Sequence, residues 1–218
     1  MQDIKLNGYI DHTFLKPAGD ADAVRKLCRE AKKFAFASVC VNPAEVPLAA
    51  KLLKKSEVKV CTVVGFPLGQ NTTEVKIFEG LDAIAKGATE LDYVINQRLI
   101  KHDPEACQAE LSAIVAACRG KLADVTLKLI IECCNLTDDE KRLACRQAKK
   151  AGFDFVKTST GFAASGATVA DVKLMRKTVG PKMGVKAAGG IRDRETALAM
   201  VAAGATRIGA SAGKALLP

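Results

Sequence analysis

The sequence predicts one α/β domain, residues 1–218, in which eight parallel strands close into a (β/α)8, or TIM, barrel. Three observations support this fold. Short apolar or β-branched runs recur eight times, the segments between them have helical periodicity, and no linker or low-complexity segment divides the chain. Alternating strands and helices favour a parallel sheet, and eight such units favour closure of that sheet.

The expected strands begin mostly about 20–35 residues apart, which suits one strand, one helix and two short loops per unit. They are expected at 9–14, 36–41, 58–64, 90–95, 126–132, 153–159, 184–188 and 206–209. The main alternative is an open doubly wound sheet, which usually has a glycine-rich turn after its first strand. The glycine pairs of this chain come late, which favours the barrel.

The expected helices carry apolar residues at helical spacing and end at glycines or capping residues. They are expected at 20–34, 72–86, 104–118, 137–150, 168–179 and 193–203. The helix 72–86 places Val75, Ile77, Phe78 and Leu81 on one side. Few residues follow the eighth strand, so the last helix is expected to be truncated, with residues 1–8 or a second subunit covering that strand.

The formal net charge is +9, from 33 Lys and Arg against 24 Asp and Glu, which predicts attraction to anions. The basic residues are scattered and the chain has no Trp, so nucleic acid is a poorer match than a small phosphorylated metabolite. No apolar run approaches the roughly 18–20 residues that span a bilayer, and no secretory signal is visible. We therefore expect a cytoplasmic protein without a membrane partner.

Eight cysteines are present, and none forms a C-x-x-C pair. With no secretory signal they are expected to be reduced thiols, so a disulfide scaffold and a structural zinc site are both disfavoured. Cys40 lies at an expected strand end and is a conceivable nucleophile. Because no histidine is near it in the sequence, we interpret it as a buried or pocket-lining thiol.

Three charged residues lie on expected strands near the end where a barrel binds its ligands. Lys157 and Lys186 occupy equivalent places on consecutive strands, and Asp92 lies on another. Two ammonium groups in a confined pocket repel each other, so one loses its proton more easily and becomes a nucleophile for a carbonyl. Asp92 is a candidate proton shuttle. A lone lysine at a strand end often only extends to solvent, which is the alternative interpretation.

Small residues follow the last two strands, in the segments 188–192 and 209–213. Barrels often bind phosphate with these two loops, through backbone N–H groups at a helix start. Tight turns are the simpler explanation of the glycines. His12 and His102 are the only histidines, and no metal-ligand spacing is present, so metal-dependent chemistry is disfavoured.

These motifs, in order over about residues 9–213, closely resemble the deoxyribose-phosphate aldolase family. The most specific are Lys-Thr-Ser-Thr-Gly-Phe at 157–162 and Lys-Ala-Ala-Gly-Gly-Ile-Arg at 186–192. Further similar segments are 10–17, 39–43, 65–69, 74–76 and 90–96. The resemblance implies a class I aldolase that cleaves 2-deoxy-D-ribose 5-phosphate reversibly to D-glyceraldehyde 3-phosphate and acetaldehyde, without a metal or organic cofactor.

Matched motif by motif, the resemblance implies that Lys157 forms the Schiff base, that Lys186 tunes it and that Asp92 relays protons. It also implies phosphate contacts from the following residues: Gly161, Gly189, Gly190 and Ser211. Ala212 stands where the family commonly has a second serine, and a tail tyrosine found in some relatives has no match. A homo-oligomer, dimer or tetramer, is expected. The alternatives are another phosphate-binding barrel lyase or isomerase, and a non-catalytic basic barrel that binds nucleic acid.

Overall fold

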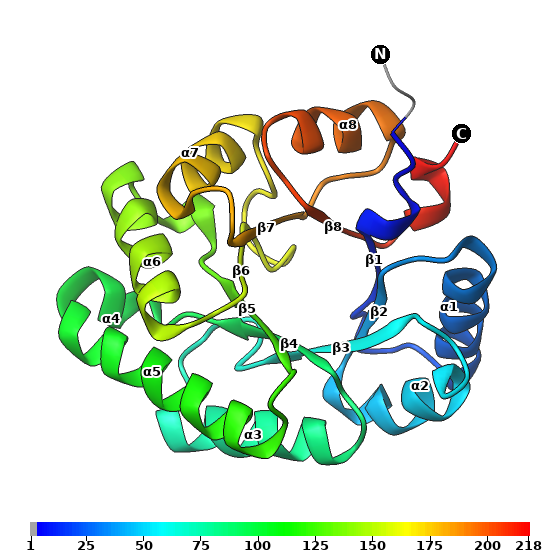
Figure 1. The fold of residues 1–218 in the computed structure, drawn as a ribbon, viewed down its shortest axis with the longest axis horizontal. Coiled ribbons are helices and arrows are strands. Elements are labelled where there is room, and N and C mark those ends of the chain that lie inside the picture. Colours follow the sequence, from blue (N-terminus) through cyan, green and yellow to red (C-terminus); the bar gives the residue numbers. More distant parts are fainter. Residues whose placement is uncertain (1–3) are drawn as a thin grey trace.

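The computed structural model describes residues 4–218, and its eight parallel strands form a closed barrel in chain order (Figure 1). The barrel closes where β1 pairs with β8, with Ile10 opposite Ile208. The strands are β1 (Ile10–Phe14), β2 (Ser38–Val41), β3 (Lys59–Val64), β4 (Glu90–Val94), β5 (Thr126–Ile130), β6 (Phe155–Lys157), β7 (Gly184–Ala188) and β8 (Arg207–Ala210). The predicted barrel fold is confirmed.

Helices surround the barrel and connect consecutive strands, as a parallel sheet requires. Within residues 4–218 the α-helices are α1 (Ala21–Phe34), α2 (Val46–Leu53), α3 (Thr73–Ala85), α4 (Gln97–His102), α5 (Pro104–Lys121), α6 (Asp138–Ala151), α7 (Val169–Val179) and α8 (Arg194–Ala202). The helices α2 and α4 were not expected from the sequence. They are only eight and six residues long, too short for a periodic pattern to stand out.

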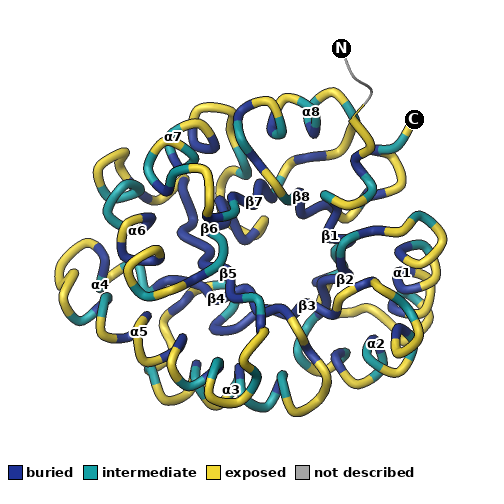
Figure 2. The backbone as a smooth tube through the Cα atoms, in the orientation of Figure 1, coloured by how far each residue is buried: buried dark blue, intermediate teal, exposed yellow. Residues whose placement is uncertain are grey.

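The strands of the barrel are largely buried, and the surrounding helices are exposed on their outer sides (Figure 2). Most buried apolar residues form one large core cluster, and several charged side chains are buried as well. Strand β4 shows how these apolar and charged residues are separated. Leu91 and Tyr93 belong to the core, while Glu90 and Asp92 alternate with them. Because successive side chains of a strand point to opposite faces, the apolar pair packs outward and the acidic pair projects inward.

The expected apolar side of α3 was wrong. Val75 and Phe78 are 48% and 73% exposed, and the buried residues of this helix are Lys76, Gly80 and Ala83. Lys76 can be buried because its Nζ lies 2.8 Å from Oε1 of Glu110. Hydropathy alone gave the wrong side, because an ion pair and a close approach at Gly80 decide which face packs inward.

The segment after β8 is a single 3₁₀ turn, η4 (Gly213–Leu216), in place of the helix that follows each of the other strands. It packs against β1 and α8, and Leu216 is buried. Leu6 is also buried, while residues 1–3 of the expected cover lie outside the described residues. The predicted truncation of the last helix is confirmed. None of the helices in residues 4–218 is long and apolar enough to cross a membrane.

The packing of α3 generates a stability prediction. A Cβ at Gly80 would lie 1.8 Å from Oη of the buried Tyr93, so Gly80→Ala should lower the free energy of unfolding by about 1–3 kcal/mol. Gly120, near the end of α5, has no atom within 4 Å of a built Cβ. Gly120→Ala is therefore the matched control and should cause no loss. Urea unfolding measures both variants, and equal stabilities would contradict the prediction.

Candidate active site

The carboxylate of Asp92 is the centre of a buried cluster of charged side chains inside the barrel. Its Oδ2 accepts hydrogen bonds from Nζ of Lys157 at 2.8 Å and Nζ of Lys186 at 2.7 Å. Its Oδ1 accepts from Nζ of Lys128 at 2.8 Å and from Sγ of Cys61 at 3.2 Å. Five consecutive strands, β3 to β7, supply these groups. The three residues that the sequence predicted therefore do meet at one point.

Two further carboxylates, those of Asp11 and Glu90, contact two of these lysines. Asp11 Oδ2 lies 2.6 Å from Nζ of Lys186, and Glu90 Oε2 lies 2.7 Å from Nζ of Lys128. Arg207 also pairs with Asp11 and, at 2.8 Å, with Glu90. The cluster is thus a continuous network of ion pairs, which is the form in which charges are tolerated in an interior.

The environment shifts the pKa values of these groups toward their ionised forms. Burial by itself raises the pKa of Asp92, but the charges of the three lysines outweigh burial and hold the pKa well below its usual range. Burial lowers the pKa of Lys186, and the carboxylates of Asp11 and Asp92 more than reverse this, so the pKa is raised. Burial also lowers the pKa of Lys128, but nearby acidic groups, chiefly Asp92, raise that pKa well above its usual value.

The network holds four basic side chains and three carboxylates, so its charge is balanced when one lysine is neutral. Lys157 is the lysine of the network with the fewest acidic partners, because within residues 4–218 it pairs only with an Asp92 oxygen that Lys186 shares. It is also the one lysine of the network that lines a cavity. The arrangement therefore leaves Lys157 as the amine of the network that meets a ligand.

The cavity that Lys157 reaches has a volume of about 300 Å³ and opens at the carboxyl ends of the strands. It brings together Lys157 and all four residues that the sequence predicted as phosphate contacts, Gly161, Gly189, Gly190 and Ser211. Asp92 and Lys186 do not line it. They are fully buried beneath Lys157 and reach a ligand only through that side chain or through water.

The loops that form the far wall of the cavity depend on glycine. Gly189 and Gly190 have φ values of +85° and +79°, a region that other residues rarely adopt. The Ala167 N–H donates to the carbonyls of Ala188 and Gly189, both at 3.0 Å, so the loop after β6 is attached to the loop after β7. These glycines line the cavity together with Ser211 and Arg192.

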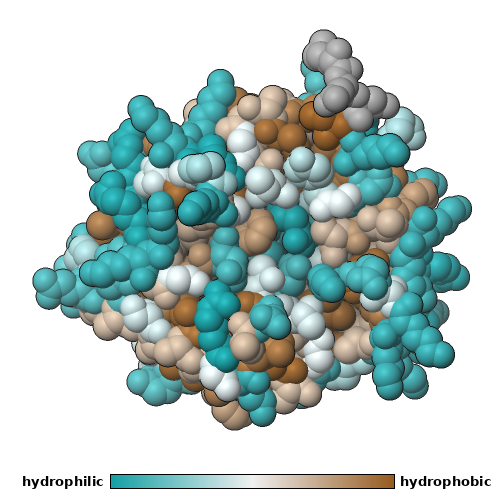
Figure 3. All heavy atoms as spheres, in the orientation of Figure 1, coloured by the Kyte–Doolittle hydropathy of each residue, from teal (hydrophilic) through white to brown (hydrophobic). Residues whose placement is uncertain are grey.

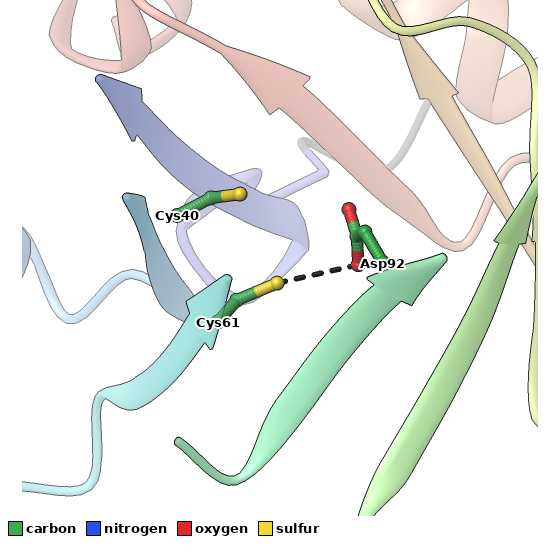
Figure 4. Close-up of side chains that lie close together, drawn as sticks. All are labelled: Cys40, Cys61 and Asp92. Carbon is green, nitrogen blue, oxygen red and sulfur yellow. Dashed lines mark hydrogen bonds between the residues drawn. The ribbon is translucent and has the colours of Figure 1, made fainter. Parts of the chain in front are cut away.

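Figure 4 shows Cys40, Cys61 and Asp92 converging from β2, β3 and β4, with their ligand atoms within 4.8 Å of one another. This set is a poor metal site on its chemistry. Both oxygens of Asp92 already accept hydrogen bonds from lysines, and Nζ of Lys128 lies 3.3 Å from Sγ of Cys61. Burial raises the pKa of Cys61 well above its usual value, which opposes the thiolate that a metal needs. Cys40 is fully buried and does not line the cavity.

Sequence reasoning missed four members of the charged network: Asp11, Glu90, Lys128 and Arg207. A signal was available for two of them, because Glu90 is two residues before Asp92, and Lys128 stands alone in an apolar strand. Arg207 is paired with Lys186 across β7 and β8, and β8 is Arg207–Ala210, one residue later than expected. That register was not visible in the sequence.

A closed barrel with a buried lysine beside its cavity is the arrangement expected of an aldolase of the Schiff-base type. Residues 6–217 match the family described as DeoC/LacD family aldolase, and the chain belongs to that family. It is 60% identical over 213 residues to the deoxyribose-phosphate aldolase of Clostridium perfringens strain 13, covering 97% of this chain and 94% of that protein. It is 58% identical over 215 residues to that of Streptococcus suis strain 98HAH33, covering 98% and 96%.

Solved structures of aldolases have a similar fold. An aldolase named QR15 has a TM-score of 0.91 at 39% identity, covering 99% of this chain and 95% of the other. The deoxyribose phosphate aldolase of Aeropyrum pernix, described as a unique tetramer, has a TM-score of 0.90 at 37% identity, covering 97% and 88%. The protein is therefore an enzyme of the aldolase class, a carbon–carbon lyase.

The pKa shifts generate a prediction for acid stability. Asp11 and Asp92 have lowered pKa values, so their stabilisation is complete at neutral pH and is lost as the pH falls below the unfolded value of about 3.9 toward the folded values. The raised pKa values of Lys128 and Lys186 give stabilisation that persists up to about pH 10.4 and is lost only at higher pH.

Urea unfolding should therefore show a nearly constant contribution from the cluster between about pH 5 and pH 9, and a decrease below about pH 4. Asp92→Asn should be less stable at neutral pH and should depend less on acid. A variant as acid-sensitive as the unsubstituted protein would contradict the assignment of this stability to Asp92.

Proposed function

We propose that the protein cleaves 2-deoxy-D-ribose 5-phosphate reversibly to D-glyceraldehyde 3-phosphate and acetaldehyde through a Schiff base on Lys157. The observation that carries the proposal is the position of Lys157, which contacts the buried Asp92 and also lines the cavity. Relatives at about 60% identity bear the name of this activity. The proposal needs no metal or organic cofactor.

The reaction begins when the neutral amine of Lys157 adds to the C1 aldehyde of the open-chain sugar. Loss of water gives an iminium ion, which withdraws electrons from the C2–C3 bond. Asp92, acting through Lys186 and water, accepts the proton of the C3 hydroxyl. The C2–C3 bond then breaks, its electron pair forms an enamine on Lys157, and C3 leaves as the aldehyde of glyceraldehyde 3-phosphate.

The second half of the reaction returns the protons. The enamine takes a proton at C2, delivered from the Asp92 and Lys186 pair through water, and becomes an iminium ion again. Water adds to that iminium and releases acetaldehyde, which restores the free amine of Lys157. Each step uses a group that lies in or directly beneath the cavity, and the same groups run the reaction in reverse.

The phosphate of the substrate is assigned to the wall formed by Gly161, Gly189, Gly190 and Ser211. Backbone N–H groups at glycines with positive φ suit an anion because no side chain separates them from it. Lys16 and Arg192 also line the cavity and add positive charge. Ala212 supplies no hydroxyl, so Ser211 is the side-chain donor of this wall. Neither a nucleic acid nor a membrane partner is part of the proposal.

A cytoplasmic location is part of the proposal as well. All eight cysteines are free thiols, and seven of them are buried. Such usage suits a reducing compartment, where thiols serve as small apolar residues and are not paired.

Trapping tests the nucleophile directly. Borohydride added with 2-deoxyribose 5-phosphate should reduce the iminium and leave a stable added mass on the peptide that contains Lys157. Lys157→Met, which keeps the volume but removes the amine, should lose the adduct and at least about a thousand-fold in kcat. Lys54→Met, at an exposed lysine, is the control and should keep both. An adduct on Lys186 would reverse the assigned roles, and no adduct would exclude the Schiff-base mechanism.

We further propose that two copies of the chain associate through α3 and the loop before it. Leu68 in the loop is 72% exposed, and Val75 and Phe78 on α3 are 48% and 73% exposed, which concentrates large apolar side chains on one part of the surface. In Figure 3 hydrophobic side chains gather over the part of the molecule where Figure 1 places α3. A self-complementary apolar surface is the simplest basis for a dimer.

Light scattering coupled to size exclusion tests the dimer. Phe78→Glu places a charge on the proposed interface and should shift the measured mass from that of an oligomer to that of one chain. Val169→Glu is the matched control, because Val169 is a partly exposed apolar residue on α7, and it should leave the mass unchanged. A Phe78→Glu variant with unchanged oligomeric mass would contradict the interface.

A further inference from the structure

Glu132 follows β5 at the ligand-binding end of the barrel and has an unusual backbone. Its φ of 54° lies in the left-handed region, which among residues 4–218 only one other non-glycine residue, Ala35, adopts. Its side chain is buried, with the residue 3% exposed. Glutamate gains nothing from this backbone conformation, which is strained and persists only where the surroundings impose it.

A bulge beyond the end of β5 imposes the conformation. The Ile131 N–H donates to the Lys157 carbonyl at 3.0 Å, and the Cys133 N–H donates to the Thr158 carbonyl at 2.8 Å. The donors are two residues apart but the acceptors are consecutive, so Glu132 is one residue too many for regular pairing. Bulges redirect a side chain and occur next to active sites. Here the redirected side chain is a carboxylate.

That carboxylate fastens the loop after β6. The Thr160 N–H donates to Oε1 at 3.2 Å and to Oε2 at 3.3 Å, and the Thr160 hydroxyl donates to Oε2. The same hydroxyl oxygen accepts from the Phe162 N–H at 3.0 Å. Gly161 lies between these two anchored residues, and its N–H has no partner within the described chain, residues 4–218.

We propose that Glu132 is a positioning residue for the phosphate of the substrate, acting through Thr160 on the free N–H of Gly161. This inference rests on the proposed function, because it assigns Gly161 to the phosphate wall. Glu132 itself lines a separate pocket of about 140 Å³ and not the cavity that holds Lys157. Its carboxylate therefore accepts from two donors of Thr160, the N–H and the hydroxyl, and does not face the anion, which it would repel.

The test separates the phosphate end of the substrate from the reacting end. Glu132→Asn suits a left-handed backbone but is one methylene too short to reach Thr160, whereas Glu132→Gln keeps the length and one acceptor oxygen. Glu57→Asn, at an exposed glutamate before β3, is the matched control. Each is assayed on 2-deoxyribose 5-phosphate, on unphosphorylated 2-deoxyribose, and for inhibition by inorganic phosphate.

We expect Glu132→Asn to raise KM for the phosphorylated sugar about ten-fold or more, and to weaken phosphate inhibition similarly, with kcat/KM for 2-deoxyribose unchanged. Glu132→Gln should recover most of the loss, and the control should match the unsubstituted enzyme. Equal losses on both sugars would mean that Glu132 only supports the fold, and would overturn the proposal. So would a variant with no loss on the phosphorylated sugar.

A second variant, Thr160→Val, and a measurement of Tm with phosphate test the role of Glu132 without relying on Glu132→Asn or on turnover alone. Thr160→Val removes the hydroxyl at constant shape and should lower the preference for the phosphorylated sugar in the same direction. Inorganic phosphate should raise the Tm of the unsubstituted protein and raise it less for Glu132→Asn. If the unsubstituted protein cleaves neither sugar, the proposed function fails, yet this difference in Tm still supports Glu132, and equal rises in Tm overturn its role.

Discussion

The buried carboxylate of Asp92 is the constraint on which the rest of the barrel depends. A charge in a dry interior is costly unless it is paired at short range, and Asp92 meets this condition with three lysines within 2.8 Å. Those lysines come from β5, β6 and β7. Any slip of one strand would turn its lysine to the outer face, so the network fixes the register of half the barrel along with its own geometry.

The same network surrounds the amine that we propose as the nucleophile. Glu90 and Asp11 pair with the other three basic side chains, Lys128, Lys186 and Arg207. Lys157 pairs with an oxygen of Asp92 that Lys186 also contacts. The cavity then exposes only Lys157 of the network to a ligand. Removal of a single carboxylate would leave more than one cation uncompensated, which would affect folding as well as catalysis.

The sequence alone predicted the eight strands and the convergence of Lys157, Lys186 and Asp92, because recurring apolar runs and period-two alternation are local signals. It did not predict the partners of those residues. Lys128 and Arg207 are single charges in strands, and which neighbour each one meets depends on strand register and barrel closure. The prediction of the buried side of α3 was wrong for a related reason. Lys76 packs inward because it pairs with Glu110, which lies on α5.

Different interactions hold the two ends of the cavity in place. Glu132, with its left-handed backbone, links one end to the other. The proposed reacting end consists of charged side chains fixed by strand register, whereas the proposed phosphate end consists mainly of loop residues, which strand register does not hold. A loop needs its own anchor to present an N–H at a defined place. The bulge at Glu132 supplies one from β5, the strand that also carries Lys128, so strand register reaches the loop through one carboxylate. In our proposal, the pairing of the barrel strands therefore positions the phosphate of the substrate as well as Lys157.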